Sequence, residues 1–149
     1  IRDGRMIGHI TDGLGMLRAI EEQGITTKQA DVLILGSGGA ARVAGYEFLA
    51  KGGRVTFAVP NKQKGEELVR ELADTQKDGH HRLSVCSLSD CAGAHDLLIN
   101  CTPVGMYPYS DAVRLAERLS IAAGRCLTLF ITPEKRVFLR WQSKRVSRQ

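Results

Sequence analysis

The sequence predicts an α/β fold in which helices flank a doubly wound parallel sheet. Short apolar runs alternate with longer stretches of helical spacing, and the first run ends in the glycine-rich segment at residues 36–39. The chain of 149 residues is 43% apolar and 25% charged, which is typical of one globular domain. Because no apolar run approaches the roughly 20 residues of a membrane-spanning helix, we expect a cytoplasmic protein with no membrane partner.

Residues 1–24 are expected to form a lead-in segment with one helix, and residues 25–149 the sheet domain. Thr11 can cap a helix that begins at Asp12, and Gly24 can end it. The apolar stripe predicted for this helix comprises Leu14, Met16, Leu17 and Ile20. Since the chain begins with Ile rather than Met, we expect a piece of a longer protein.

The remaining elements are predicted from apolar runs and from the Gly, Pro and polar residues that separate them. Residues 30–35 form a short continuous run, as expected of a strand that is covered on both faces. The runs predicted as further strands are 54–59, 82–88, 96–101 and 126–131. The stretches predicted as helices are 40–51, 64–75, 111–119 and 133–145, with a short helical turn at 89–94.

The net charge of +5 is located in a basic tail, residues 134–149, which holds six Lys or Arg and one Glu. A solvated helix face or a frayed terminus is the simplest interpretation of such a tail. Because no aromatic stacking platform accompanies the charge, we expect no nucleic-acid partner.

Four cysteines stand at positions 86, 91, 101 and 126. Their spacing matches neither a CxxC motif nor a small secreted disulfide scaffold, so we expect four buried or half-buried thiols in a reducing compartment. His80 and His81 lie near Cys86 but beside polar residues, which favours a solvated loop and no metal site.

A candidate phosphate-binding loop follows the first predicted strand. Gly36, Ser37, Gly38, Gly39, Ala40 and Ala41 fit the pattern G-x-G-x-x-G/A between a predicted strand and a predicted helix. Backbone amides bared by small residues, together with a helix N-terminus, can hold a pyrophosphate in a Rossmann-like domain. The alternative is a glycine turn that serves packing alone.

The end of the second predicted strand discriminates between dinucleotides. An NAD site usually places Asp or Glu there for the ribose hydroxyls, whereas residues 55–63 contain no acid. Asn61, Lys62 and Lys64 are therefore the candidate ligands of a 2′-phosphate, and NADP is the expected cofactor. An ordinary solvated helix start is the alternative for these lysines.

Three segments resemble those of the shikimate dehydrogenase family. G-H-I-T-D-G-L-G-M at residues 8–16 resembles the family's G-x-N-T-D-G-x-G-F, and residues 33–58 are similar to its glycine-loop unit. D-L-L-I-N-C-T-P-V-G-M at residues 96–106 resembles D-L-L-I-N-A-T-P-x-G-M. The quinate dehydrogenases and the bifunctional dehydroquinase-shikimate dehydrogenases share these segments.

The resemblance implies NADP-linked interconversion of 3-dehydroshikimate and shikimate. Asp12 would contact the substrate and act with a lysine in proton transfer. The residues implied to lie along the nicotinamide are Thr102, Pro103, Val104, Gly105 and Met106. The family's substrate domain, which carries that lysine, normally precedes this segment. We therefore expect a small-molecule substrate shared with a missing N-terminal domain, and a catalytically silent isolated chain.

The sequence also departs from the family pattern. Ile10 stands at a usual Asn, Val59 and Pro60 stand at a usual Asn-Arg, and Ile131 stands at a usual Tyr. A noncatalytic dinucleotide-binding or interaction module is therefore an alternative function. Another NADP-linked reductase, such as the glutamyl-tRNA reductase group, is disfavoured by the T-D-G-x-G and T-P-x-G-M segments.

Overall fold

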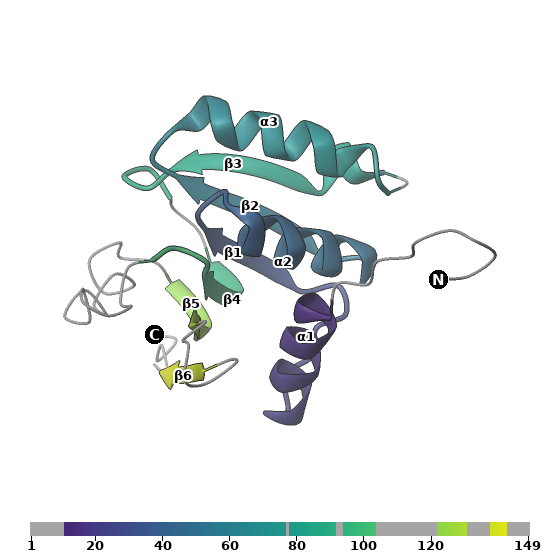
Figure 1. The fold of residues 1–149 in the computed structure, drawn as a ribbon, viewed down its shortest axis with the longest axis vertical. Coiled ribbons are helices and arrows are strands. Elements are labelled where there is room, and N and C mark those ends of the chain that lie inside the picture. Colours follow the sequence, from purple (N-terminus) through teal and green to yellow (C-terminus); the bar gives the residue numbers. More distant parts are fainter. Residues whose placement is uncertain (1–10, 77, 92–93, 104–121, 131–137, 143–149) are drawn as a thin grey trace, which may run out of the picture.

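A single mixed sheet organises the chain (Figure 1). The computed structural model describes residues 11–76, 78–91, 94–103, 122–130 and 138–142. The strands are β1 (Asp31–Leu35), β2 (Arg54–Val59), β3 (Leu83–Ser87), β4 (Ala94–Asn100), β5 (Ala122–Phe130) and β6 (Phe138–Gln142), in the order β3-β2-β1-β4-β5-β6. Neighbouring strands from β3 to β5 are parallel. The predicted Rossmann-like α/β architecture is confirmed.

Strand β1 lies in the middle of the core. Val32 and Ile34 belong to the larger apolar cluster on one face of the sheet, while Leu33 and Leu35 belong to a smaller cluster. All four side chains are at most 1% exposed. The strand is thus covered on both faces, which is why its sequence is continuously apolar instead of alternating.

The described helices are α1 (Asp12–Glu22), α2 (Gly39–Ala50) and α3 (Lys62–Ala73), followed by the short 3-10 turn η1 (Gly79–His81). Helix α2 packs on β1 and β2, and α3 packs on β2 and β3 (Figure 1). Ile20, Phe48 and Leu72, one from each helix, join the larger cluster. The three helices therefore bury their apolar sides in one core. None of the helices within the described ranges is long and apolar enough to cross a bilayer.

The edge of the sheet that receives the carboxyl ends of the strands also carries two helix starts. Figure 1 shows the arrowheads of β1, β2 and β3 pointing to the same edge, where α2 and α3 begin. This arrangement brings backbone amides and helix N-termini to one side of the sheet, the usual place for ligands in open α/β sheets.

Helix α1 differs in two details from the prediction. It begins at Asp12 and is followed by Gly24 at φ +72°, as predicted, but Thr11 makes no side-chain capping hydrogen bond. Leu14 is 54% exposed and not part of the buried stripe. The buried positions are Gly13, Met16, Leu17 and Ile20. Helix α1 contacts α2 at Gly13, where an added Cβ would lie 2.8 Å from a methyl of Val43. Because Gly13 faces α2, the next residue, Leu14, lies on a different side of the helix and is exposed.

The prediction of a last helix over residues 133–145 is wrong for residues 138–142. These form β6, which pairs antiparallel with β5 in a register that sets Phe138 opposite Phe130 and Trp141 opposite Leu127. Aromatic residues favour strands, and the free edge of β5 supplies the backbone partners. The predicted turn at 89–94 is a three-residue turn at 88–90, and β4 already begins at Ala94. The predicted helix at 111–119 lies outside the described residues.

The expectation of four free thiols is also wrong. Cys86 and Cys91 form a disulfide, with 5.7 Å between their Cα atoms. The turn after β3 brings the two residues within bonding range, a proximity that their spacing in the sequence does not reveal. Cys101 is a free, half-buried cysteine.

Candidate cofactor site

The glycine loop makes a tight turn directly after β1. Gly36 has φ +106°, and its N–H donates a hydrogen bond to Ala58 O, with 2.9 Å between nitrogen and oxygen. A Cβ at this position would lie 3.2 Å from Thr102 Cγ2 and 3.3 Å from Cys101 O. Both the backbone angle and the close neighbours therefore require glycine.

The start of α2 is bare. Gly38 is the N-cap residue in an extended conformation, and a Cβ on Gly38 or Gly39 would meet no atom within 4 Å. Both residues are exposed, and the first turn carries no acid. The first amides of a helix have no intrahelical partner, and the N-terminus carries partial positive charge. No packing contact among the described residues requires glycine at these two positions, whereas the close approach of an anion would.

Ala41 marks the packed side of the same helix start. It is fully buried, as predicted for the small residue that lets α2 approach the sheet. The loop thus presents peptide groups on its open side and a small apolar residue on its closed side.

A second loop lies against the first. Strands β1 and β4 are neighbours, with Leu35 opposite Asn100. Asn100 is 6% exposed, and its Oδ1 accepts hydrogen bonds from the Thr102 N–H (3.0 Å) and the Thr102 hydroxyl (2.6 Å). The predicted segments at Gly36 and Thr102, which are far apart in sequence, therefore meet at the junction of β1 and β4.

Asn100 was not singled out as a site residue from the sequence. The available signal is a polar amide at the end of β4, directly after the apolar residues 97–99 and two positions before Thr-Pro. Of the remaining residues predicted in this loop, Pro103 is exposed, and Val104, Gly105 and Met106 lie outside the described residues.

The thiol of Cys101, which lies between Asn100 and Thr102, is expected to be unreactive. Burial raises the pKa of its thiol to about 12, because the charged thiolate is poorly solvated there. Its backbone N–H donates to Leu35 O at 3.0 Å, so its part in the site is to join β4 to β1.

Cationic side chains gather at the start of α3. Asn61 caps this helix, its Oδ1 accepting from the Lys64 N–H at 3.3 Å, and the first turn contains no acid. Lys62 Nζ lies 3.9 Å from Glu66 Oε1, with its side chain 70% exposed. Lys64 makes no ion pair with any described residue. Two cations at the positive end of a helix repel each other and the helix dipole, so an anion there would be stabilised.

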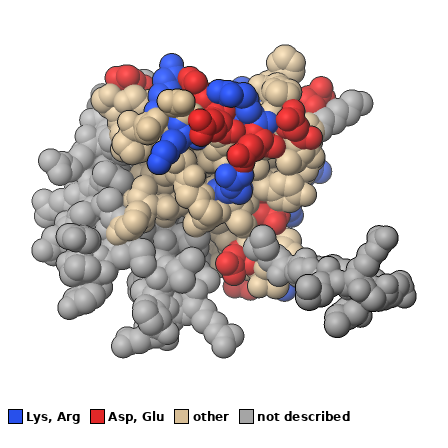
Figure 2. All heavy atoms as spheres, turned by 45° about the horizontal axis from the view of Figure 1, so that its top comes forward, with Lys and Arg blue, Asp and Glu red and all other residues tan. Residues whose placement is uncertain are grey.

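The rest of the exposed face of α3 is electrically mixed. Figure 2 shows Lys or Arg interleaved with Asp or Glu on the face that bears this helix. Arg42 of α2 pairs with Glu71 of α3 in this region. On the rest of this face, positive and negative side chains thus alternate, whereas the first turn of α3 holds two lysines and no acid.

Asp12 stands apart from these loops. It is the first residue of α1, is exposed, and its carboxylate makes no hydrogen bond or ion pair within the described part of the chain. The structure does not bring it into contact with the glycine loop or with Thr102.

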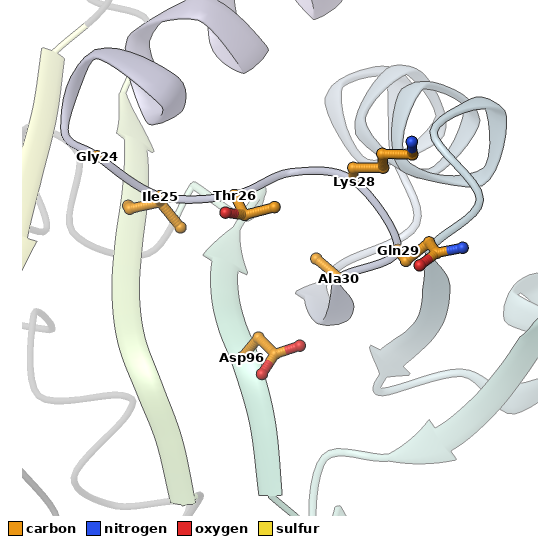
Figure 3. Close-up of a pocket in the computed structure, with 7 residues that line it drawn as sticks. All are labelled: Gly24, Ile25, Thr26, Lys28, Gln29, Ala30 and Asp96. Atoms are coloured by element: carbon orange, nitrogen blue, oxygen red, sulfur yellow. The ribbon is translucent and has the colours of Figure 1, made fainter.

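A cavity of about 460 Å³ lies at the opposite edge of the sheet, where β1 and β4 begin (Figure 3). Its lining residues are Gly24, Ile25, Thr26, Lys28, Gln29, Ala30 and Asp96. The Asp96 carboxylate accepts from the Asp31 N–H at 2.9 Å, and the Asp31 carboxylate lies 2.6 Å from His95 Nδ1. These polar contacts link the starts of the two strands, at the end remote from the glycine loop.

Known proteins resemble the chain in sequence and in fold, although no protein-family model matches it. The NADP(+) shikimate dehydrogenase of Methanococcus maripaludis is 34% identical over 145 residues, which cover 97% of this chain and 51% of that protein. A crystal structure of a shikimate dehydrogenase in complex with NADP+ is 36% identical at a TM-score of 0.60, covering 77% of this chain and 40% of that one. A 5-ketofructose reductase of Gluconobacter sp. is 30% identical at a TM-score of 0.58, covering 70% and 38%. The chain spans about half the length of the curated relatives it matches.

Proposed function

We propose, on the premise that this chain belongs to the shikimate dehydrogenase family, that it holds the NADP of an oxidoreductase interconverting 3-dehydroshikimate and shikimate. The observation that carries the proposal is the bare, exposed start of α2 at Gly38 and Gly39, next to the Asn100–Thr102 turn. An anion can approach the amides of this helix start without displacing any side chain.

The pyrophosphate would be held by the amides of residues 36–41 and by the positive end of α2. NADP supplies the hydride chemistry when it is bound, and the protein supplies its orientation. Asn100 keeps Thr102 beside Gly36, so the loop of residues 102–106 is proposed to border the nicotinamide end.

The 2′-phosphate would lie at the start of α3. Lys64 is the better placed of the two lysines, because Glu66 partly neutralises Lys62. Asn61 already uses its Oδ1 to cap the helix, which leaves its amide N–H groups for the ligand. The absence of an acid between Val55 and Gln63 removes the repulsion that a 2′-phosphate would otherwise meet.

Asp12 is proposed to orient a small hydroxy-acid substrate and to share proton transfer with a lysine outside these 149 residues. The substrate would therefore be bound jointly with another domain, in a cytoplasmic enzyme. Shikimate and quinate remain alternative substrates, since both are hydroxy acids of the same ring type.

The proposal is tested by titrating the protein with NADPH and NADH and following calorimetric heat. NADPH is expected to bind more tightly by about tenfold or more, because charge-assisted hydrogen bonds to a phosphate contribute about 1.5–3 kcal/mol. Lys64→Ala should remove most of this preference and leave NADH binding unchanged. Equal affinity for the two cofactors would contradict the lysine site.

Gly38→Ser separates binding from folding. Serine is a favourable N-cap residue and its Cβ has open space, so the thermal midpoint should not fall. The hydroxyl would, however, occupy the path of the pyrophosphate and satisfy an amide meant for it, so both dinucleotides should bind at least about tenfold more weakly. Unchanged binding in this variant would refute the pyrophosphate site.

A noncatalytic dinucleotide-binding module is the second candidate, favoured by Val59 and Pro60 in place of the family's Asn-Arg pair. Such a module would bind NADPH normally but would show no response to shikimate, even when it is tested together with the domain that supplies the lysine. An NADPH affinity that changes when shikimate is added would favour the enzyme.

A further inference from the structure

The disulfide between Cys86 and Cys91 closes the turn that follows β3. We propose that this pair is a reversible modification site that exchanges with low-molecular-weight thiols of the glutathione class and thereby adjusts dinucleotide affinity. The proposed thiol–disulfide exchange depends only on the Cys86–Cys91 pair and not on the function proposed above. Its effect on affinity rests on the function proposed above.

The pair lies beside the proposed 2′-phosphate site. In the parallel pairing of β2 with β3, Cys86 is opposite Ala58 and Ser87 is opposite Val59. Val59 is the last residue of β2, only three positions before Lys62. The turn enclosed by the disulfide and the start of α3 therefore share one edge of the sheet.

Besides the disulfide, two kinds of contact hold this turn: the packing of Cys86, Leu88 and Cys91 against the smaller apolar cluster, and weak hydrogen bonds at its exposed tip. The Asp90 N–H donates to Ser87 O at 3.1 Å, and the Ser87 and Ser89 hydroxyl oxygens lie 2.8 Å apart. Ser89 and Asp90 are exposed. Hydrogen bonds between exposed groups contribute little net stability, so loss of the disulfide would loosen the turn.

Both cysteines are partly exposed. Each is half-buried against the smaller apolar cluster, which includes Leu35 and Ala58. Cys101 is half-buried as well, but desolvation raises the pKa of its thiol to about 12, so it would not compete as a thiolate. In reducing compartments thiols are mostly kept reduced, and the disulfides that do form there are usually catalytic or redox-sensing.

The exchange balances with two small thiols. One thiolate attacks a sulfur of the Cys86–Cys91 bond, forming a mixed disulfide and expelling the other cysteine as a thiolate. A second small thiolate attacks the mixed disulfide and releases a small-molecule disulfide. The two small thiols are thus oxidised by two electrons, and both protein cysteines are left as thiols after protonation. The reverse sequence, with the small disulfide as oxidant, restores the bond.

A link to dinucleotide binding follows from the layout of the edge. A dinucleotide whose pyrophosphate lies at the start of α2 and whose 2′-phosphate lies at the start of α3 extends from β1 toward β2 and β3. A turn that is already ordered next to this path costs less entropy on binding than a loose one. We therefore expect the disulfide form to bind NADPH more tightly.

The exchange is tested in buffers that step from reduced to oxidised glutathione, with alkylation and mass spectrometry locating free thiols at residues 86 and 91. The folded protein should pass reversibly between dithiol and internal disulfide. A pair that resists reduced glutathione in the folded state would overturn the proposal, as would a pair that gives only glutathione adducts when oxidised.

The effect on affinity is measured by NADPH titration of the oxidised and reduced protein. Reduction should weaken binding by about threefold to tenfold, which corresponds to ordering one or two side chains. The double variant Cys86→Ser/Cys91→Ser should bind NADPH with the affinity of the reduced wild-type protein. Its affinity should not change with the ratio of reduced to oxidised glutathione. The reduced wild-type protein serves the same purpose if that variant does not fold.

The outcomes distinguish the two proposals. Equal NADPH affinity in both states would overturn the control of binding and leave NADP binding in place. Absence of NADPH binding in both states would refute the proposed function, and also the control of affinity that depends on it. Mass spectrometry would still decide the exchange.

Discussion

At Gly36 the backbone turns with φ +106° within van der Waals contact of the next loop, and Asn100 holds that loop through two hydrogen bonds to Thr102. One residue without a side chain and one buried amide therefore determine how closely the two halves of the site approach. Neither effect needs a charged group. The close approach at Gly36 and the hydrogen bonds of Asn100 both depend on the position of Thr102.

Gly36→Ala should destabilise the fold by about 1–3 kcal/mol, since an L-residue is strained at this φ and the new methyl meets Thr102 Cγ2. Urea denaturation measures the loss. Gly39→Ala is the matched control, because its Cβ has open space at an exposed helix start and stability should hardly change. Equal losses in both variants would show that the turn tolerates a side chain.

Cys101 should react slowly with thiol reagents. With its pKa raised to about 12, only on the order of one molecule in ten thousand carries the thiolate at pH 8. Site-resolved mass spectrometry after brief alkylation should find Cys101 unmodified in the folded protein and modified in urea. Rapid labelling of the folded protein would mean that β4 and β1 separate there.

At the scale of elements, the starts of α2 and α3 differ in how their first amides are satisfied. Helix α2 begins with a glycine and offers its amides to a ligand, while α3 begins with Asn61, which caps its own helix. The same sheet edge thus combines an open helix start, where we propose that the pyrophosphate binds, with a capped start that carries the lysines. The difference lies in one side chain at each N-cap position.

Asn61→Ala should cost about 0.5–2 kcal/mol, because the Lys64 N–H loses its acceptor. Asn61→Ser keeps a capping oxygen and is the matched control. Thermal denaturation of the two variants should differ by several degrees, with the serine variant near wild type. Equal melting of both would show that the cap contributes nothing.

The segment between α1 and β1 carries a pH-dependent contact. The Thr27 hydroxyl donates to the Glu21 carboxylate, and with Lys51 Nζ at 3.4 Å it lowers the pKa of Glu21 from its ordinary 4.5. A lowered folded-state pKa stabilises the protein above the unfolded value, and this contribution disappears as the pH falls through the lowered value.

Glu21→Gln should therefore lower the urea midpoint at pH 7, and the difference from wild type should shrink on acidification below about pH 4.5. Urea denaturation at several pH values follows the change. A difference that stays constant down to acid pH would attribute the effect to packing and not to charge.

At the scale of the whole molecule, the order β3-β2-β1-β4 decides which loops become neighbours. It places the glycine loop between the loop of Thr102 on one side and the lysines of α3 on the other. The NADP site proposed above uses all three segments. Asp12 has no part in this group within the described residues.

These 149 residues alone should not produce NADPH from shikimate and NADP+. Asp12 has no basic partner in the described ranges. We propose that the lysine that acts with it lies outside these 149 residues. The absorbance of NADPH during prolonged incubation provides the measurement. Turnover that disappears in Asp12→Asn would contradict the expectation and would show that the chain carries a complete catalytic group.

The sequence by itself determined the elements whose cause is local. Residues 30–35 and 54–59 are apolar runs, and the strands observed there differ from prediction by at most one residue. The glycine pattern at residues 36–41 and the lack of an acid in residues 55–63 can likewise be read directly from the sequence. Short-range propensity and hydrophobic period decide such features before any tertiary contact forms.

Only the tertiary structure decided the features that depend on contacts between distant or neighbouring segments. Residues 138–142 form a strand because β5 offers an edge, Leu14 is exposed because Gly13 turns α1 toward α2, and the turn after β3 brings Cys86 to Cys91. The contact of Gly36 with Thr102 belongs here as well. In each case the assembly of the sheet and its turns determines which segments come into contact, and the spacing of the residues in the sequence does not reveal these contacts.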